Sequence, residues 1–267
     1  MEIPLDQLSY CSMTSFFSDI RGFTGFSEKL TPEDLVSLLN RYLTIMTDII
    51  LETGGTVDKF EGDAIIAFWG APLPLEDHAV RACSAALRCH EAHVEMNRQL
   101  MLEGYPEIFT RIGLSTGDMV VGNMGSSKRF DYTAIGSTVN LGSRLEGANK
   151  VYDTSIMVPE DTFKNAQNQF VFRELDTIRV VGQQIPVKVY ELKCRRDEIT
   201  DELETLLREY SSALDLYRKG DFRAAAEKFS SEGDPTSMIM AQRCGQMIEE
   251  YADDPDKWDG VFNLSSK

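Results

Sequence analysis

Hydrophobic and polar residues follow two different patterns along the first 195 positions of the chain, one typical of strands and one typical of helices. Residues 13–18 form a short apolar run that is typical of a buried strand. From residue 35 to residue 50, apolar side chains recur three or four positions apart, which predicts an amphipathic helix. A Thr-Pro pair at residues 31–32 suits the start of that helix, and two glycines at residues 54–55 suit its end.

The alternation continues through the rest of this segment. Two strands are predicted on either side of a tight turn at residues 61–63. A Gly- and Ser-rich loop is expected at residues 122–128. The order strand, helix, two strands, helix, strand is the split β-α-β or ferredoxin-like arrangement, which predicts an α+β domain with helices on one face of a sheet. The predicted strands are 56–60, 64–69, 111–116, 119–121, 155–158, 170–175 and 187–192, and the further helices are 77–103 and 138–150.

After residue 195 the pattern becomes purely helical. Residues 210–229 resemble one tetratricopeptide-like helical hairpin. A single hairpin cannot bury its own apolar face, so we expect it to pack on the first domain, on a third helix at 237–251 or on a partner. Trp258 and Phe262 could pin the tail to the first domain or form a hook for a partner. The predicted domains are therefore 1–195, of mixed type, and 196–267, an all-α extension.

Composition narrows the classes of function. The 267 residues include 43 acidic and 27 basic side chains, and the net charge of -16 disfavours a nucleic-acid-binding surface. Five cysteines without a Cys-x-x-Cys pair indicate reduced intracellular thiols. Neither a signal peptide nor a bilayer-spanning stretch is evident. We expect a cytoplasmic location, which includes the cytoplasmic part of a membrane-anchored protein.

Two carboxylates are the first candidates for chemistry. Asp19 follows the first predicted strand and precedes a glycine-containing turn, and Asp63 lies in the turn of the hairpin. In a split β-α-β fold the first strand lies beside this hairpin, so the two side chains could meet. A pair of carboxylates suits magnesium or manganese, and two such ions could activate a hydroxyl and stabilise a leaving phosphate.

Residues 132–144 form a further candidate. Asn140 and Arg144 are four positions apart on one helix face and could bind a sugar hydroxyl and a phosphate. Taken alone, these residues favour a solvated helix face. Cys89 and His93 have the spacing of zinc ligands, but without an evident fourth ligand they favour packing.

Together, the segments that contain Asp19 and Asp63 and the segment at residues 132–144 resemble the catalytic domain of class III nucleotidyl cyclases, specifically adenylate cyclases of the bacterial type. The resemblance covers residues 10–193. It includes Arg-Ile-Gly-Leu-Ser-Thr-Gly at residues 111–117 and Val-Gly-Asn at residues 121–123. Several ordered motifs at family spacing are far more specific than any one of them.

The resemblance implies an enzyme that converts ATP into cyclic AMP and pyrophosphate. It implies that Asp19 and Asp63 bind two divalent metal ions, with the backbone carbonyl of Ile20 as a further ligand. Lys59 and Thr133 occupy the positions that choose the base, and these residue types favour adenine. Asn140 would orient the ribose and Arg144 would stabilise charge at the α-phosphate. The backbone N–H groups expected near the phosphates are those of Gly22, Phe23 and Thr24.

The resemblance also implies a homodimer with the site shared between the subunits. The metal ligands would come from one chain, and Lys59, Thr133, Asn140 and Arg144 from the other. Residues 122–131 resemble an arm that crosses to the partner, although a mobile hairpin explains them equally well. Any sensor or membrane region that controls the enzyme would lie outside this chain.

One departure from the family concerns a Lys-Gly-Lys segment that contacts the terminal phosphates. Here the segment reads Val181-Gly182-Gln183, so both lysines are missing. Substitute cations could be Arg179, Lys188 or Arg21. The departure keeps open a rival function, a catalytically weak cyclase-like nucleotide sensor or scaffold.

Two other rivals are enzymes. Lys59 and Thr133 argue against a guanylate cyclase. A diguanylate cyclase would carry Gly-Gly-Asp-Glu-Phe in the hairpin turn, where this chain has Glu-Gly-Asp-Ala-Ile at residues 61–65.

Overall fold

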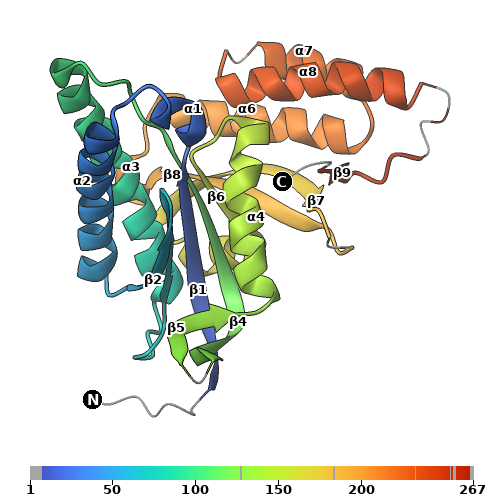
Figure 1. Cartoon of the computed structure of the whole chain (residues 1–267). Coiled ribbons are helices and arrows are strands. Elements are labelled where there is room, and N and C mark those ends of the chain that lie inside the picture. The colour runs from blue at the N-terminus through green and yellow to red at the C-terminus, as the bar shows by residue number, and fades with distance from the viewer. Residues whose placement is uncertain are drawn as a thin grey trace.

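A computed structural model describes residues 8–126, 128–182, 184–231, 233–252, 254 and 257–264 (Figure 1). Within these ranges, nine strands form one mixed sheet in the order β2-β3-β1-β4-β6-β8-β7-β9, with β5 paired to β4. The central strand β1 pairs antiparallel with both β3 and β4. The strands are β1 (Ser9–Ile20), β2 (Thr56–Glu61), β3 (Ala64–Trp69), β4 (Thr110–Ser126), β5 (Arg129–Ile135), β6 (Ile156–Pro159), β7 (Phe170–Arg179), β8 (Val187–Arg195) and β9 (Phe262–Asn263).

The three long helices of the first domain, at residues 32–52, 78–103 and 137–152, begin and end close to their predicted limits, whereas the short helices at 23–27 and 160–166 were not predicted. The Thr31 hydroxyl accepts a hydrogen bond from the Asp34 backbone N–H, and Pro32 opens the first long helix, as predicted. No helix in the described ranges is long and apolar enough to cross a membrane. The helices are α1 (Phe23–Ser27), α2 (Pro32–Glu52), α3 (His78–Glu103), α4 (Ser137–Tyr152), α5 (Glu160–Ala166), α6 (Asp201–Arg218), α7 (Phe222–Ser230) and α8 (Pro235–Glu250).

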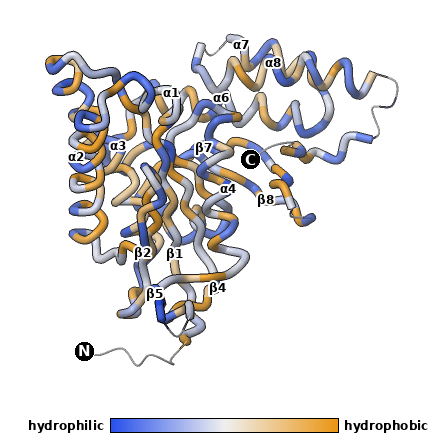
Figure 2. Tube along the Cα trace, in the orientation of Figure 1, coloured by the Kyte–Doolittle hydropathy of each residue, from blue (hydrophilic) through white to orange (hydrophobic). Residues whose placement is uncertain are grey.

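Helices cover both faces of the sheet, so the prediction of one covered face is wrong (Figure 1). Phe16 on β1 belongs to the core beneath α2 and α3. Along those two helices, hydrophobic and hydrophilic residues alternate (Figure 2). Helix α4 packs on the opposite face, with its backbone very close to the strands. A Cβ atom on Gly113 of β4 would lie 2.2 Å from the Gly142 carbonyl oxygen, and one on Gly142 would lie 2.8 Å from Ser15 Oγ. Two glycines therefore allow α4 to pack this closely against the sheet.

Residues 122–126 of the predicted loop are instead part of a long β-hairpin. Strand β4 continues to Ser126, and β5 pairs with it from Arg129 onward. The hairpin packs on the sheet through Tyr132, whose ring centroid lies 6.1 Å from that of Phe68. Glycine and serine disfavour strands when read locally, so long-range pairing overrides the local signal here.

The C-terminal extension packs on the first domain and also on its own third helix. Tyr210 and Tyr217 of α6 share a core with Leu145 of α4 and with the sheet. The Trp258 indole N–H donates to the Arg218 carbonyl at 3.2 Å, which holds the tail against the extension. Strand β9, which contains Phe262, then pairs with β7. The α+β class with a helical extension is confirmed, while the domain boundary at residue 195 stays a prediction.

Two buried arginines join the extension to the rest of the chain in opposite directions. Arg173 of β7 donates to Asp234 at 2.5 Å and to Thr236 at 2.7 Å, both at the start of α8.

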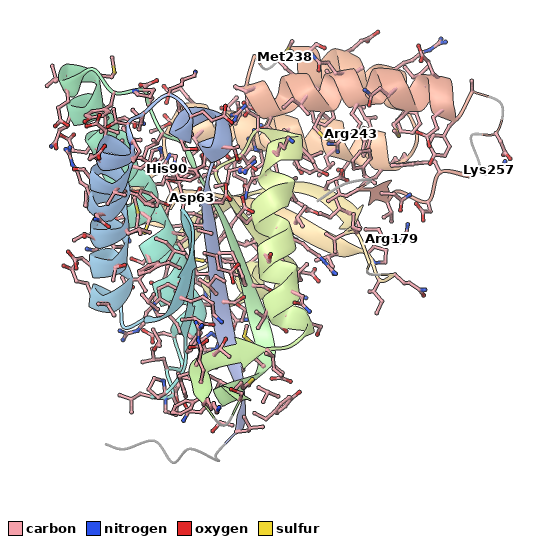
Figure 3. The ribbon with its side chains drawn as sticks, in the orientation of Figure 1. Asp63, His90, Arg179, Met238, Arg243 and Lys257 are labelled. Atoms are coloured by element: carbon pink, nitrogen blue, oxygen red, sulfur yellow. The ribbon has the colours of Figure 1, made fainter. Side chains whose placement is uncertain are left out.

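Arg243 of α8 reaches back into the first domain (Figure 3). It donates to the hydroxyl of Tyr152, at the end of α4, at 3.0 Å and to the Asp176 carboxylate at 2.9 Å. Asp176 is fully buried and also accepts from the Tyr152 hydroxyl at 2.8 Å. The end of α4 is therefore tied to α8 through buried charge.

We expect Arg243→Met to destabilise the protein by about 3–5 kcal/mol, because the substitution leaves the Asp176 carboxylate buried without its cation. The free energy of unfolding from urea titrations followed by circular dichroism measures the effect. Arg223→Met, which removes an exposed arginine of α7, is the matched control. Equal destabilisation by the two variants would show that the buried pair contributes nothing.

Candidate functional site

Asp19 and Asp63 come together around one backbone position. Asp19 lies near the end of β1, and Asp63 lies in the turn between β2 and β3. Because β1 and β3 are paired, with Ser18 opposite Ile65, the turn lies beside the end of β1. The Asp63 carboxylate accepts a hydrogen bond from the Ile20 backbone N–H at 2.9 Å. The structure thus has the proximity that the sequence predicts.

Two charged residues that the sequence analysis missed extend this pair. Arg111 lies opposite Asp19 in the β1–β4 register and donates to its carboxylate at 3.1 Å. The same guanidinium lies 3.1 Å from the carboxylate of Glu146 on α4. The available signal was the position of Arg111 at the start of the motif at residues 111–117. Glu146 could be recognised only once α4 was known to pack beside β1.

The electrostatics of this cluster favour a bound cation. Burial raises the pKa of the Asp63 carboxyl, and the nearby charge of Asp19 raises it further. Burial also raises the pKa of Glu146 to about 7, although Arg111 opposes the shift. Asp19 and Glu146 thus flank one guanidinium, with Asp63 in electrostatic range of it. Added positive charge would stabilise the ionised forms of Asp63 and Glu146.

The donor set suits a hard cation such as magnesium or manganese. Two carboxylates and the Ile20 carbonyl would supply oxygen ligands only. The described residues contain no group of three or more His, Cys, Asp or Glu side chains that could hold a metal ion. A cation held by Asp19 and Asp63 would therefore fill its remaining positions with water or phosphate oxygens, as magnesium commonly does.

Gly22, Phe23 and Thr24 follow this cluster directly. Gly22 adopts a φ of 70° at the turn, and α1 starts at the next residue. The turn is fixed to the sheet because the Arg21 backbone N–H donates to the Phe109 carbonyl at 2.7 Å. Gly22 therefore lies in a fixed turn beside the carboxylates, and Phe23 and Thr24 are the first residues of α1.

Lys59 and Thr133 are also brought together, by a residue that the sequence analysis missed. The Thr133 hydroxyl on β5 donates to the carboxylate of Asp58 on β2 at 2.5 Å. Lys59 Nζ lies 3.4 Å from the other oxygen of the same carboxylate. One buried acid thus links two residues that are 74 positions apart in the chain.

Asn140 and Arg144 lie one turn apart on α4. Asn140 is exposed and Arg144 is partly buried. Within the described ranges, no hydrogen bond or ion pair engages either side chain. A Cβ atom on Gly182 would lie 3.2 Å from Arg144 Nη2, so the hairpin between β7 and β8 passes beside the guanidinium. Gln183, at the predicted departure from the family, lies outside the described residues.

These two residues point away from the carboxylate cluster. At about 100° per residue, Arg144 and Asn140 are rotated by roughly 160° and 120° from Glu146 around the axis of α4. Glu146 faces Arg111 and hence the Asp19 side of the sheet. One chain therefore presents the carboxylates and the Asn140–Arg144 pair in different directions.

The three substitute cations differ in their surroundings. Arg179 already donates to the Gln184 carbonyl at 3.0 Å and to Asn263 in the tail (Figure 3). Arg21 pairs with Asp153 at 2.8 Å. Lys188 Nζ lies 3.8 Å from the Glu174 carboxylate, a longer contact than those of Arg179 and Arg21, so Lys188 is the least tightly engaged of the three.

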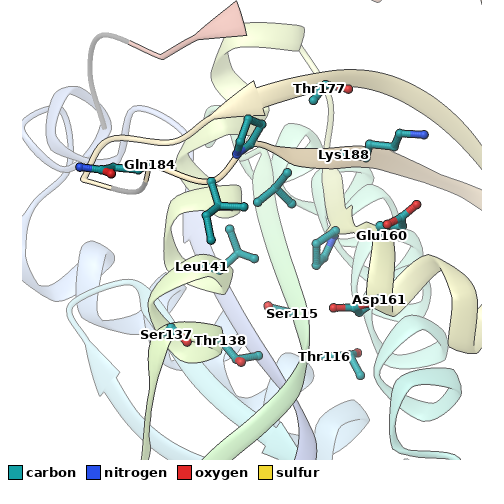
Figure 4. Close-up of a pocket in the computed structure, with 14 residues that line it drawn as sticks. Ser115, Thr116, Ser137, Thr138, Leu141, Glu160, Asp161, Thr177, Gln184 and Lys188 are labelled. Atoms are coloured by element: carbon teal, nitrogen blue, oxygen red, sulfur yellow. The ribbon is translucent and has the colours of Figure 1, made fainter. Parts of the chain in front are cut away.

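A cavity of about 690 Å³ lies between α4, α5 and the β7–β8 hairpin (Figure 4). Hydroxyl groups line one side, among them those of Ser115 on β4 and Ser137 and Thr138 on α4, and Lys188 lies at another. Among the described residues that were predicted for the site, only the candidate cation Lys188 lines this cavity.

Comparison with known proteins identifies the first domain. Residues 5–194 match the family model described as the adenylate and guanylate cyclase catalytic domain. The chain is 37% identical to adenylate cyclase 1 of Rhizobium meliloti over 180 residues, which are 67% of this chain and 27% of that relative. The chain thus spans about a quarter of the length of that curated relative.

Solved structures of two kinds of cyclase are similar to this chain. The adenylyl cyclase CyaB from P. aeruginosa has a TM-score of 0.67 and 36% identity, with 73% of this chain and 100% of that chain covered. The guanylyl cyclase Cya2 has a TM-score of 0.66 and 34% identity, covering 72% of this chain and 96% of that chain. Overall similarity therefore does not separate the two base specificities. Because the family model covers most of its length, the chain belongs to the adenylate and guanylate cyclase catalytic domain family.

Proposed function

We propose that this chain is an adenylate cyclase, which converts ATP into 3′,5′-cyclic AMP and pyrophosphate. The observation that carries the choice of ATP is the pairing of Lys59 with Thr133 around Asp58. A lysine ammonium can only donate hydrogen bonds, whereas a threonine hydroxyl can also accept one. The pair thus suits the ring nitrogen and the exocyclic amine of adenine.

Asp19, Asp63 and the Ile20 carbonyl would hold two divalent metal ions. When bound, such ions lower the pKa of the ribose 3′-hydroxyl and neutralise charge on the triphosphate. The backbone of Gly22, Phe23 and Thr24 would then face the phosphate oxygens.

The chain's other polar groups would act on the sugar and on the reacting phosphate. Asn140 orients the ribose so that its 3′-oxygen lies in line with the α-phosphorus. The new bond joins that oxygen to phosphorus, the bond to pyrophosphate breaks, and the hydroxyl proton leaves to solvent. Arg144 donates to the α-phosphate oxygens and binds the transition state more strongly than the ground state.

The site would be completed by a second copy of the chain. The opposite directions of the carboxylate cluster and the Asn140–Arg144 pair on α4 support this arrangement. In a symmetric homodimer, each carboxylate cluster can face the Asn140–Arg144 pair of its partner, which gives two equivalent sites.

A catalytically weak nucleotide sensor is the second candidate. Val181 and Gln183 stand where the two lysines of the Lys-Gly-Lys segment would be, and Arg179 is already engaged by the tail. The loss of phosphate-binding charge would weaken ATP binding. Turnover measurements separate the two candidates.

We expect the purified chain to form cyclic AMP from ATP, and much less cyclic GMP from GTP, with magnesium or manganese present. Asp63→Asn should lower the rate by about a hundredfold or more, because the metal loses a charged ligand. Asp48→Asn, which removes an exposed acid from α2, should change nothing. Chromatographic quantification of both cyclic products measures the outcome. A folded protein that makes neither product would favour the sensor.

Mixing two inactive variants tests the shared site. Asp63→Asn and Arg144→Ala damage different halves, so each alone should be nearly inactive. After subunit exchange, half of the dimers are mixed and each has one intact site, so activity should recover to about a quarter of wild type. The mixture is compared with each variant incubated alone, and exchange is verified by mass-tagged subunits. A mixture that exchanges but stays inactive would contradict the shared site.

A further inference from the structure

The surroundings of the base-reading pair point to a residue that controls specificity. Asp58 lies between Lys59 and Thr133, and its side chain is only 3% exposed. We propose that Asp58 fixes the direction of the hydrogen bonds that this pair offers, and so makes the site select adenine over guanine. This inference rests on the proposed function and assigns to Asp58 a role in positioning and specificity.

A β-bulge explains how neighbouring residues can serve one site. In a regular strand, Asp58 and Lys59 would point to opposite faces of the sheet. In the β2–β3 pair the register shifts between Val57 and Lys59, so Asp58 is the inserted residue. A bulge of this kind re-aims a side chain, and here it lets the Asp58 carboxylate lie close to the Lys59 ammonium.

The long hairpin of β4 and β5 supplies Thr133, the third residue of this group. Strand β5 pairs only with β4, in the described part of the chain, and lies near one end of β2 (Figure 1). The contact between Phe68 and Tyr132 holds it against the sheet. Thr133 follows Tyr132 and thereby reaches Asp58, with 2.5 Å between the hydroxyl and the carboxylate oxygen.

The hydrogen bond from Thr133 to Asp58 has a fixed direction. A carboxylate can only accept hydrogen bonds, so the Thr133 hydroxyl must donate its single proton to Asp58. The oxygen of Thr133 can then offer only lone pairs to a nucleotide. Without Asp58 the same hydroxyl could rotate and donate instead.

The second carboxylate oxygen acts on Lys59. This oxygen is buried and accepts no hydrogen bond within the described residues, and the Lys59 ammonium is 3.4 Å away. The attraction holds the ammonium beside Thr133 while leaving N–H groups for a ligand. One acid thus sets a donor and an acceptor side by side.

This donor–acceptor order matches adenine and opposes guanine. Adenine accepts at ring nitrogen N1 and donates from its 6-amino group, whereas guanine donates at N1 and accepts at O6. A site with a fixed hydrogen-bond polarity rejects the opposite pattern, because polar groups are left unpaired in the complex.

The test compares ATP with inosine triphosphate, which has the 1- and 6-positions of guanine without its 2-amino group. In Asp58→Leu, the ratio of kcat/KM for ATP to that for inosine triphosphate should fall roughly tenfold, the equivalent of one hydrogen bond. Asp58→Thr, which can donate as well as accept, should also lower the ratio and serves if the leucine variant does not fold. Asp58→Asn keeps an acceptor for Thr133 and should keep most of the selectivity.

The ratio is independent of how much of each preparation is active, so general damage to the fold does not move it. An unchanged ratio in Asp58→Leu and Asp58→Thr would overturn the role of Asp58. If the wild type turns over no nucleotide, the proposed activity fails separately. The same comparison is then made with the dissociation constants of ATP and inosine triphosphate from calorimetry. Equal changes in both constants would overturn the inference in that case.

Discussion

Strand β1 lies between β3 and β4, and its antiparallel pairing on both sides sets the positions of the charged groups. The pairing with β3 places the Asp63 turn against the Ile20 backbone. The pairing with β4 places Arg111 opposite Asp19. A slip of one residue in either pair would turn these side chains to the other face of the sheet. The register of the central strand therefore determines whether the carboxylate cluster exists.

Helix α4 is constrained at both its middle and its end. The contact between Gly113 and Gly142 brings its backbone so close to the sheet that no side chain fits between them. At its end, Tyr152 is held by Asp176 and Arg243 in a buried network. Because Asn140 and Arg144 project from this helix, small displacements of α4 would move both groups relative to a substrate. The extension thus braces the element that carries the proposed catalytic groups.

The sequence was informative about where the long helices start and about the order of the strands. The start of α2 could be predicted from Thr31 and Pro32, and the meeting of Asp19 with Asp63 followed from the order of strands. The close packing of α4 on the sheet could not be predicted, because Gly113 and Gly142 resemble ordinary small residues until the strand and the helix are paired in space. Asp58 was missed for a similar reason: its function depends on a bulge in β2 and on a strand that begins 71 positions later. Interactions across the sheet leave no periodic trace in the sequence.

The overall charge makes the local arrangement of cations decisive for binding ATP. A chain with a net charge of -16 repels a polyanionic nucleotide at long range. Its carboxylate cluster adds to this repulsion, because Arg111 is already shared between Asp19 and Glu146. Metal ions would reverse the sign of the potential at that cluster, while Arg144 carries no ion pair in the described ranges and remains available to phosphate. Binding of ATP should therefore depend steeply on the divalent cation, and more so because Val181 and Gln183 replace the two lysines of the family segment and carry no charge.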